Sequence, residues 1–351
     1  MKAARLHDYH QDLVIEEVPE PEITDPFDVI VRIGAAGLCR TDLHIKQGEF
    51  EQEHKDAGLA LPYTPGHENA GWVEAVGSGV KHLQPGDAVI LHPFVSCGVC
   101  HGCRAGMDMR CENATFPGLY TDGGFAEKIK TGARAALKLA PNLTPADVAP
   151  MACGGITAYH AVKRASPLLL PGTTVAVIGA GGLGHVGIQC LAAMTPAEII
   201  VIDANPAALE LATSLGATHT VLADGGQVEA VKSLTGGHGA DVVIDFVAER
   251  GTERWGVDLL RSFGSYFIVG YGGVLEEETK RIINNEISFI GNLIGNFNEL
   301  GELLALMAQG KVTLHTSLYG LDDINSAMSD LDGGRLRGRG IIVPAGARAS
   351  A

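Results

Sequence analysis

An alternation of short apolar runs and helical stretches, which begins at about residue 172, most strongly limits the folds open to this chain. The apolar runs have strand length and are rich in β-branched residues: TTVAVIG, EIIVID, HTVL, DVVIDFV and SYFIVG. Between them lie GHVGIQCLAAM, NPAALELATSLG and GQVEAVKSLTG, which are typical of helices. Strands that are apolar on both faces and joined by helices indicate a parallel sheet covered on both sides. The sequence therefore predicts an α/β protein with a doubly wound parallel sheet.

The rest of the chain has a different pattern. Before residue 150, the runs VIVRIGAAG, NAGWVEAVGSGV and PGDAVILHP read as strands joined by tight turns, so this part is predicted to be mostly β. After residue 290 we expect a strand in ISFIGNLIG, a helix in FNELGELLALMAQG and a frayed end in AGARASA. A chain of 351 residues has the length of two domains.

Charge and composition exclude some classes of partner. The formal net charge of −15 disfavours nucleic acid, whose phosphates the chain would repel. The uncharged stretch 165–197 has membrane-spanning length, but its prolines and glycines favour a strand, a turn and a buried helix, so we expect no membrane segment. The first residues lack an apolar signal core, so the seven cysteines predict a reducing compartment, the cytoplasm.

Four of these cysteines are closely spaced. Cys97, Cys100, Cys103 and Cys111 follow the pattern C-x2-C-x2-C-x7-C, in which four soft thiolates suit tetrahedral zinc. An iron–sulfur cluster and a group of redox-active thiols are the alternatives. His101 could compete as a ligand, but its place inside the turn favours a solvated side chain. Because four thiolates would close the site, we expect a structural role.

A glycine motif marks the expected cofactor site. Gly179, Gly181 and Gly184 form G-x-G-x-x-G between an apolar strand and a helix, and Asp203 ends the next strand. This arrangement is typical of a dinucleotide-binding turn, with a pyrophosphate at the helix N-terminus and the acid on the adenosine ribose. Asp203 would repel a 2′-phosphate, and no Arg or Lys follows in DANPAALE. NAD is therefore favoured over NADP.

Three further residues could bind a metal, although their types alone do not show it. Cys39 in GLCRTDLH, His67 in PGHENAG and Cys153 in MACGGITAYHA each lie beside glycine-rich backbone. Taken separately, such residues belong to a core or a surface more often than to a metal site. Their separation along the chain does not show whether they meet. Cys190, on the apolar helix after the glycine turn, fits a free buried thiol.

In combination, these motifs give a specific resemblance. GLCRTDLH, GHENAGWVEAVGSGV, the four-cysteine segment, MACGGITAYHA and GAGGLGHVG occur in the order found in zinc-dependent alcohol dehydrogenases of the medium-chain dehydrogenase/reductase family, which the whole chain resembles. The resemblance implies a GroES-like catalytic domain at 1–153 with a structural zinc lobe at about 95–113. It also implies a Rossmann NAD-binding domain at 154–290 and a return to the catalytic domain at 291–351.

The resemblance assigns roles by position. It implies two zinc ions per chain: a catalytic one on Cys39, His67 and Cys153, with an open fourth position, and a structural one on the four clustered cysteines. Glu68 matches an acid beside the metal, and Asp42 matches the acid that orients the histidine ligand. Arg40 and Arg339 match side chains near the cofactor pyrophosphate. The resemblance also adds Gly182, Leu183 and Val269 to the residues expected to bind the cofactor.

The implied activity is reversible oxidation of primary or secondary alcohols to aldehydes or ketones by hydride transfer to NAD. Thr41 and His44 would pass the alcohol proton outward, provided that a helix begins after Cys39 and places them on one face. A polar surface pair is the alternative for these two residues. A polyol dehydrogenase and a catalytically inactive cofactor-binding protein are the rival functions. The family further implies a small-molecule substrate and a homo-oligomer, either a tetramer or a dimer.

Overall fold

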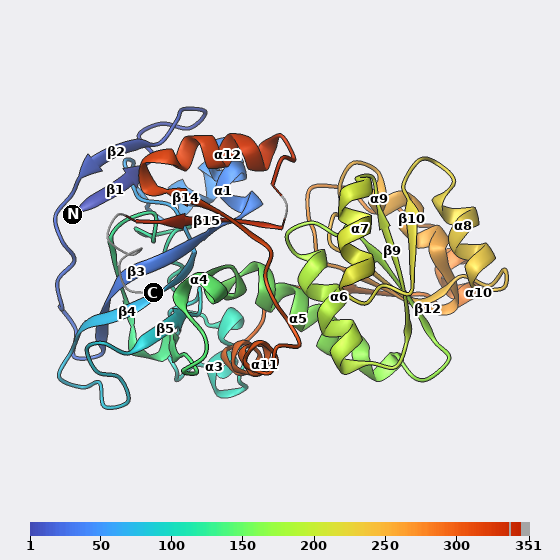
Figure 1. Ribbon diagram of the computed structural model, residues 1–351, viewed down its shortest axis with the longest axis horizontal. Coiled ribbons are helices and arrows are strands. Elements are labelled where there is room, and N and C mark those ends of the chain that lie inside the picture. Colours follow the sequence, from blue (N-terminus) through green and yellow to red (C-terminus); the bar gives the residue numbers. More distant parts are fainter. Residues whose placement is uncertain (337, 345–351) are drawn as a thin grey trace. The chain divides into compact units, whose positions relative to one another are not determined.

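The computed structural model describes residues 1–336 and 338–344, and the chain forms two compact units (Figure 1). The first unit contains Met1–Gly154 and the chain from Gly295 onward, and the second contains Gly155–Ile294. The chain therefore leaves the first unit, builds the second and returns. The expected frayed end, AGARASA, lies outside the described residues.

The second unit is built on a six-stranded parallel sheet with the order β10-β9-β8-β11-β12-β13. The strands are β8 (Thr174–Ile178), β9 (Glu198–Asp203), β10 (His219–Leu222), β11 (Ala240–Asp245), β12 (Leu260–Ile268) and β13 (Ser288–Gly291). The strand order reverses direction between β8 and β11, where doubly wound sheets bind ligands beyond the carboxyl ends of the strands. The predicted α/β class is confirmed.

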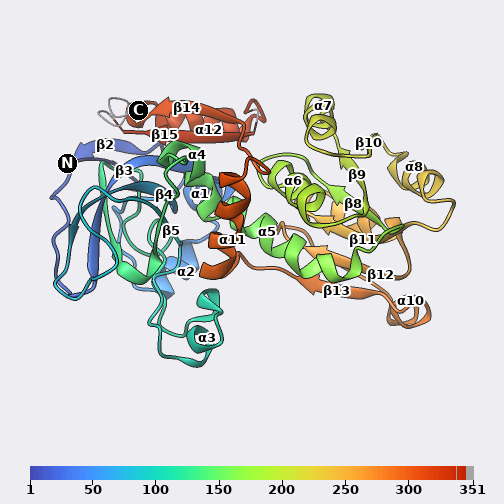
Figure 2. The same cartoon turned by 60° about the horizontal axis from the view of Figure 1, so that its bottom comes forward.

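Helices cover both faces of this sheet (Figure 2). They are α5 (Gly154–Ala165), α6 (Gly184–Met194), α7 (Pro206–Ser214), α8 (Gln227–Leu234), α9 (Thr252–Trp255) and α10 (Thr279–Asn285). Helix α6 has the same bounds as the stretch GHVGIQCLAAM from which it was predicted. One core cluster includes Ile200, Val243 and Tyr266, which are almost fully buried. Burial of both sheet faces explains why the sequence of these strands is apolar without alternation.

The first unit is a mixed β structure. Its seven-stranded sheet has the order β14-β15-β3-β4-β5-β7, with β6 also paired to β3, and a hairpin of β1 and β2 lies outside this sheet. The strands are β1 (Lys2–Arg5), β2 (Val14–Glu17), β3 (Asp28–Leu38), β4 (Glu68–Val76), β5 (Ala88–Leu91), β6 (Lys128–Gly132), β7 (Ala136–Lys138), β14 (Thr316–Gly320) and β15 (Arg339–Val343). The two parts of the chain join where β15 pairs antiparallel with β3.

Short helices surround the strands of the first unit. They are α1 (Arg40–Lys46), α2 (Glu51–Asp56), α3 (His101–Arg104), α4 (Pro145–Val148), α11 (Phe297–Ala308) and α12 (Ile324–Asp332). Figure 2 shows α12 beside β14 and β15, and α3 on a lobe that projects away from the strands. Among the described residues, no helix combines the length and the apolar character needed to cross a bilayer.

The strand predicted at 287–295 is shorter in the structure and belongs to the second unit. Strand β13 ends at Gly291, and the backbone N–H of the next residue, Asn292, still donates to the Ile268 carbonyl at 2.9 Å. The Asn292 side-chain amide donates to the carbonyls of Ile268 and Ile290 at 3.1 and 2.9 Å. An asparagine side chain that bonds neighbouring carbonyls in this way caps the end of the strand pair.

We predict that the core of the second unit is sensitive to loss of volume. Ile200→Ala should lower the free energy of unfolding by about 2–5 kcal/mol, because Ile200 is 1% exposed and its removal leaves a cavity. Ile283→Ala is the matched control: Ile283 is 72% exposed, so its effect should stay within about 0.5 kcal/mol. Urea unfolding followed by circular dichroism measures both, and equal losses would contradict this description of the core.

Candidate active site and metal centres

Two predicted metal ligands meet because β3 and β4 pair as an antiparallel ladder. Gly37 lies opposite Glu68 in this ladder. Cys39 follows the end of β3 as the N-cap of α1, and His67 directly precedes β4. Positions far apart in sequence are thus brought to the same end of one strand pair.

Cys153 joins this pair from the turn before α5. Ligand atoms of Cys39, His67, Glu68 and Cys153 all lie within 4.8 Å of one another. Cys39, His67 and Glu68 are buried, whereas Cys153 is partly exposed. Two thiols and one imidazole form a donor set that suits a zinc ion with a remaining open position. The residues present therefore fit the catalytic metal that the sequence predicts.

The ionisation of this cluster also favours a bound cation. The hydrogen bond with Cys153 holds the pKa of Cys39 well below its usual value, and His67 acts in the same direction. The same hydrogen bond, together with burial, raises the pKa of Cys153 well above its usual value. The protein alone thus favours one thiolate and one thiol. A zinc ion would supply the charge that lets both sulfurs bind as thiolates.

Asp42 holds the histidine. Its Oδ1 lies 3.3 Å from Nδ1 of His67, and its Oδ2 accepts the backbone N–H of Cys39 at 2.9 Å. Both side chains are almost fully buried. Because Nδ1 faces the Asp42 carboxylate, Nε2 is the ring nitrogen available to a metal. A single carboxylate therefore connects two of the predicted ligands.

Glu68 is held by Arg339, which lies on β15. Burial raises the pKa of Glu68 to about 7, and the Arg339 guanidinium opposes this rise. The two side chains form a buried ion pair, and Oε1 of Glu68 also accepts the Gly154 N–H at 2.9 Å. Space for this pair requires glycine: a Cβ at Gly37 would lie 2.1 Å from Glu68 Oε2, and one at Gly154 would lie 2.8 Å from the Arg339 guanidinium.

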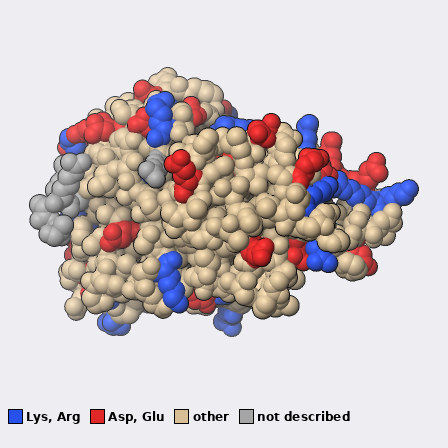
Figure 3. Space-filling view, turned by 45° about the vertical axis from the view of Figure 1, so that its right-hand side comes forward, with Lys and Arg blue, Asp and Glu red and all other residues tan. Residues whose placement is uncertain are grey.

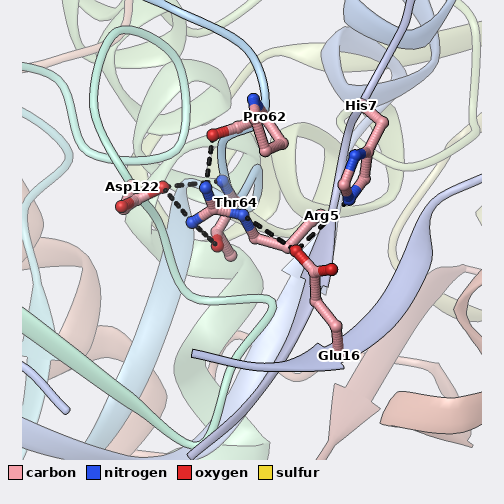
Figure 4. A network of polar contacts seen from close by, with 6 residues as sticks. All are labelled: Arg5, His7, Glu16, Pro62, Thr64 and Asp122. Atoms are coloured by element: carbon pink, nitrogen blue, oxygen red, sulfur yellow. Dashed lines mark hydrogen bonds and ion pairs between the residues drawn. The ribbon is translucent and has the colours of Figure 1, made fainter. Parts of the chain in front are cut away.

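The segment before His67 is held by polar contacts with Arg5 and Asp122 (Figure 4). Arg5 on β1 donates to the carbonyl of Pro62 and lies 3.2 Å from Asp122. Asp122 also accepts the backbone N–H of Thr64 at 2.7 Å. These contacts connect β1 and the loop at Asp122 to the approach to the metal ligand, which limits how far His67 can move.

Thr41 and His44 lie on a helix, as the relay hypothesis requires. Helix α1 begins at Arg40, directly after Cys39. The Thr41 hydroxyl lies 3.6 Å from the Cys39 sulfur. His44 is 9% exposed, and its Nδ1 is 3.7 Å from Glu49, whose side chain is 53% exposed. Thr41 therefore lies beside one member of the ligand cluster, and His44 lies beside an exposed carboxylate.

The four clustered cysteines also converge. Their sulfurs lie within 4.8 Å of one another, and those of Cys97 and Cys103 are 3.9 Å apart. Sulfurs bound at about 2.3 Å to a tetrahedral zinc ion would be about 3.8 Å apart, so this spacing fits the metal. His101 is exposed at the start of α3 and is not part of this group.

The surrounding lobe is anchored at its base. An isolated bridge pairs Val95 with Thr115, close to the predicted lobe limits of 95 and 113. Asp108 accepts the Ser96 hydroxyl at 2.9 Å and the backbone N–H of Phe297 on α11 at 3.2 Å. Burial raises the pKa of Cys103 to about 12, so a cation is needed to hold that sulfur as a thiolate.

In the second unit, the glycine motif forms a tight turn after β8. Gly179 has φ +87°, and a Cβ at Gly184 would lie 1.8 Å from the Gly179 carbonyl oxygen. A Cβ at Gly181 would meet no described atom within 4 Å. Gly179 and Gly184 are therefore needed for the turn itself, while the space at Gly181 fits the close approach of a ligand. Helix α6 begins at Gly184, where its dipole favours a pyrophosphate.

Asp203 touches this turn from the end of β9. Its Oδ2 accepts the backbone N–H of Ala180 at 2.7 Å, and its Oδ1 accepts that of Asn205 at 2.8 Å. Its charge thus lies beside the turn, as the NAD hypothesis requires. The other predicted cofactor residues of this unit are Gly182 and Leu183 in the turn and Val269, which follows β12 and is 8% exposed.

The two arginines predicted at the pyrophosphate belong to the first unit. Arg40 begins α1 and is half-buried. Arg339 is 4% exposed, and its guanidinium is paired with Glu68. This partner was not foreseen from the sequence, because residues so far apart give no local signal of contact. A role of either arginine with the cofactor stays a prediction.

Known proteins support this reading of the two units. Residues 25–141 match the family model of the alcohol dehydrogenase GroES-like domain, and residues 182–309 match that of zinc-binding dehydrogenases. An NAD-dependent alcohol dehydrogenase of Sulfurisphaera tokodaii is 35% identical over 98% of this chain and 100% of that protein. A D-arabinose 1-dehydrogenase (NADP(+)) of Saccharolobus solfataricus is 34% identical over 98% of this chain and 97% of that protein.

The structures agree with the sequences. The alcohol dehydrogenase of Aeropyrum pernix superposes with a TM-score of 0.94 at 48% identity, covering 98% of this chain and 100% of that chain. The family models, the relatives and the solved structure agree over both units. The chain belongs to the zinc-dependent alcohol dehydrogenases of the medium-chain dehydrogenase/reductase family.

Proposed function

We propose that this chain is an NAD-dependent alcohol dehydrogenase that interconverts primary or secondary alcohols with aldehydes or ketones. The observation that carries the proposal is the convergence of Cys39, His67 and Cys153, with Asp42 behind the histidine. The similarity of nearly the whole chain to an NAD-dependent alcohol dehydrogenase supports the same activity.

The chemistry divides between the bound groups and the side chains. A zinc ion supplies Lewis acidity that lowers the pKa of an alcohol oxygen, and NAD accepts the hydride. Cys39, His67 and Cys153 would hold the metal, and Asp42 fixes the imidazole through Nδ1. The Thr41 hydroxyl would take up the alcohol proton while it gives up its own proton toward His44. His44, close to exposed Glu49, would pass a proton on to water.

The likeness to a D-arabinose 1-dehydrogenase keeps a polyol or sugar as the rival substrate class. Absorbance at 340 nm distinguishes them, using ethanol, a secondary alcohol, an aromatic alcohol, a polyol and D-arabinose with NAD and with NADP. Turnover of simple alcohols with NAD supports the proposal. Turnover confined to the polyol or the sugar would replace it with the rival, and no turnover of any substrate would favour an inactive protein.

The proposal also covers the cellular compartment, the class of partner and the oligomeric state of the enzyme. Six of the seven cysteines lie in the two candidate metal sites, which fits a reducing compartment, the cytoplasm. The net charge of −15 argues against nucleic acid, and on the face in Figure 3 the basic side chains are dispersed among acidic ones. A homo-oligomer, either a tetramer or a dimer, follows from family resemblance, and light scattering of the purified protein measures it.

Metal content gives the first prediction for this site. The purified protein should hold about two zinc ions per chain, because one donor set is closed and the other open. Cys100→Ser should lower this value to about one and reduce the thermal midpoint, since the lobe loses a thiolate ligand. Elemental analysis with calorimetry measures both. Iron with matching sulfide would replace the structural zinc with an iron–sulfur cluster.

Cofactor choice gives the second prediction. NAD should be preferred over NADP, since Asp203 would meet a 2′-phosphate with like charge. Asp203→Ser should narrow the preference, but this change also removes the acceptor for the Ala180 and Asn205 N–H groups. Asp203→Asn keeps an acceptor oxygen and removes the charge, so it is the sharper variant. The ratio of kcat/KM for the two cofactors measures the effect, and equal use by the wild type would contradict the role of Asp203.

The proton path gives the third prediction. Thr41→Ala should keep its zinc and bind NADH but oxidise alcohols about 10²–10⁴-fold more slowly, because the alcohol proton loses its first acceptor. Thr41→Ser, which retains a hydroxyl, should recover much of the rate. His44→Gln should be milder, since water can replace a group nearer to solvent. Turnover over a range of pH, with zinc assayed alongside, measures all three, and full activity of Thr41→Ala would show that the pair is only polar surface.

A further inference from the structure

A buried carboxylate in the second unit has no role in the chemistry above. Asp245 ends β11 and is fully buried. Burial raises the pKa of Asp245 above its usual value, and the hydrogen bonds that its oxygens accept offset part of this rise. An acid this deep is expensive to keep unless its oxygens are fully partnered, so its contacts indicate what it stabilises.

Four donors surround Asp245. The backbone N–H groups of Val247 and Ala248 both donate to Oδ1 at 2.8 Å. The Tyr266 hydroxyl on β12 donates to Oδ2 at 2.6 Å, and the Thr252 hydroxyl at the start of α9 donates to it at 3.0 Å. One carboxylate thus joins the loop 246–251 to the strand beside it and to the helix that follows it.

The loop needs such support because its backbone is strained. Ala248 and Arg250 have φ values of +46° and +58°, which residues with a Cβ rarely adopt, and Gly251 has φ +92°. Backbone of this kind persists only where the surroundings determine it, and it is often found at functional sites. The bonds from Val247 and Ala248 to Asp245 hold the chain where this strain begins.

The same loop lies against the glycine turn. Strands β8 and β11 are neighbours, with Asp245 opposite Ile178. The N–H of Phe246 donates to the Ile178 carbonyl at 3.0 Å. A Cβ at Gly179 would lie 2.6 Å from Val247. The loop therefore borders the point where the strand order reverses and a dinucleotide is expected to bind.

The sheet also indicates which half of the cofactor faces this loop. A dinucleotide crosses the reversal point, with one mononucleotide on each half of the sheet. Asp203 on β9, the predicted partner of the adenosine ribose, lies in the half on the β8 side. Loop 246–251 follows β11 in the other half of the sheet. We therefore expect this loop to face the nicotinamide mononucleotide.

We propose that Asp245, held by Tyr266 and Thr252, is a positioning residue that fixes loop 246–251 as a wall for the nicotinamide half of NAD. This inference rests on the proposed use of NAD. Asp245 touches neither metal nor substrate in this scheme. Asp245 acts through the loop. Loss of its hydrogen-bond partners should therefore weaken binding of the complete dinucleotide, while a ligand that has only the adenosine half should bind as before.

The test removes donors without changing the shape of the core. In the full zinc-loaded protein, Tyr266→Phe and Thr252→Val each delete one hydroxyl, and the double variant leaves Oδ2 without either donor. The control is Tyr319→Phe in the first unit, which deletes a more exposed Tyr–Asp hydrogen bond, to Asp330 at 2.8 Å, outside this network. Calorimetric titration with NADH and with AMP gives the two dissociation constants, and steady-state kinetics gives KM for NAD and for the alcohol.

In the double variant, we expect the dissociation constant for NADH to rise roughly tenfold, the size of one or two lost hydrogen bonds. The constant for AMP should stay within about twofold, KM for NAD should rise with little change in KM for the alcohol, and the control should match the wild type. Thr252→Ser should restore NADH affinity relative to Thr252→Val. If the double variant does not fold, each single variant should show roughly threefold weakening.

NADH binding within about twofold of the wild type would overturn the proposal. Equal weakening of NADH and AMP would also overturn it, because the network would then only stabilise the unit as a whole. A wild-type protein that bound no NADH would instead contradict the proposed function, so the two failures are distinguishable.

Discussion

The structure depends on one cluster of ionisable side chains whose charges the protein alone does not balance. Cys39, His67, Glu68 and Cys153 place their ligand atoms within 4.8 Å of one another, largely out of contact with water. Such a group is costly unless each charge has a partner. Asp42 and Arg339 supply part of the compensation, and a metal ion would supply the rest. The β3–β4 ladder, the glycines at 37 and 154 and the pairing of β15 with β3 all bring these partners together.

Much of the fold could be predicted because its signals are local. The apolar strands of the parallel sheet and helix α6 follow from periodicity and turn residues, and the glycine turn follows from its motif and context. The four-cysteine spacing likewise predicted a compact ligand set, since its members lie within one short loop. Strands β14 and β15 were not foreseen: each has five residues and depends on pairing with distant chain. The strand after Ile287 was predicted too long because the capping effect of Asn292 has no periodic signature.

The candidate sites show the same division between local and distant information. Cys39, His67 and Cys153 were found by resemblance, because nothing in their separate surroundings shows that they meet. The pairing of Glu68 with Arg339 and the partners of Asp245 were not foreseen, since each joins elements through packing. A buried acid at the end of an apolar strand, as in DVVIDFV, is the one signal that could have drawn attention to Asp245.

The insertion of one unit within the other has a consequence for synthesis on the ribosome. Residues 155–294 are contiguous, so the second unit can fold as soon as they emerge. The first unit cannot, because β15, which lies between β14 and β3 in its sheet, is made only after the second unit. Until then β3 lacks one neighbour and Glu68 lacks its guanidinium partner. The unit that carries both cysteine sites is therefore completed after the second unit. A ribosome that stalls before residue 339 leaves an acidic, thiol-rich intermediate with an open sheet edge for chaperones to protect.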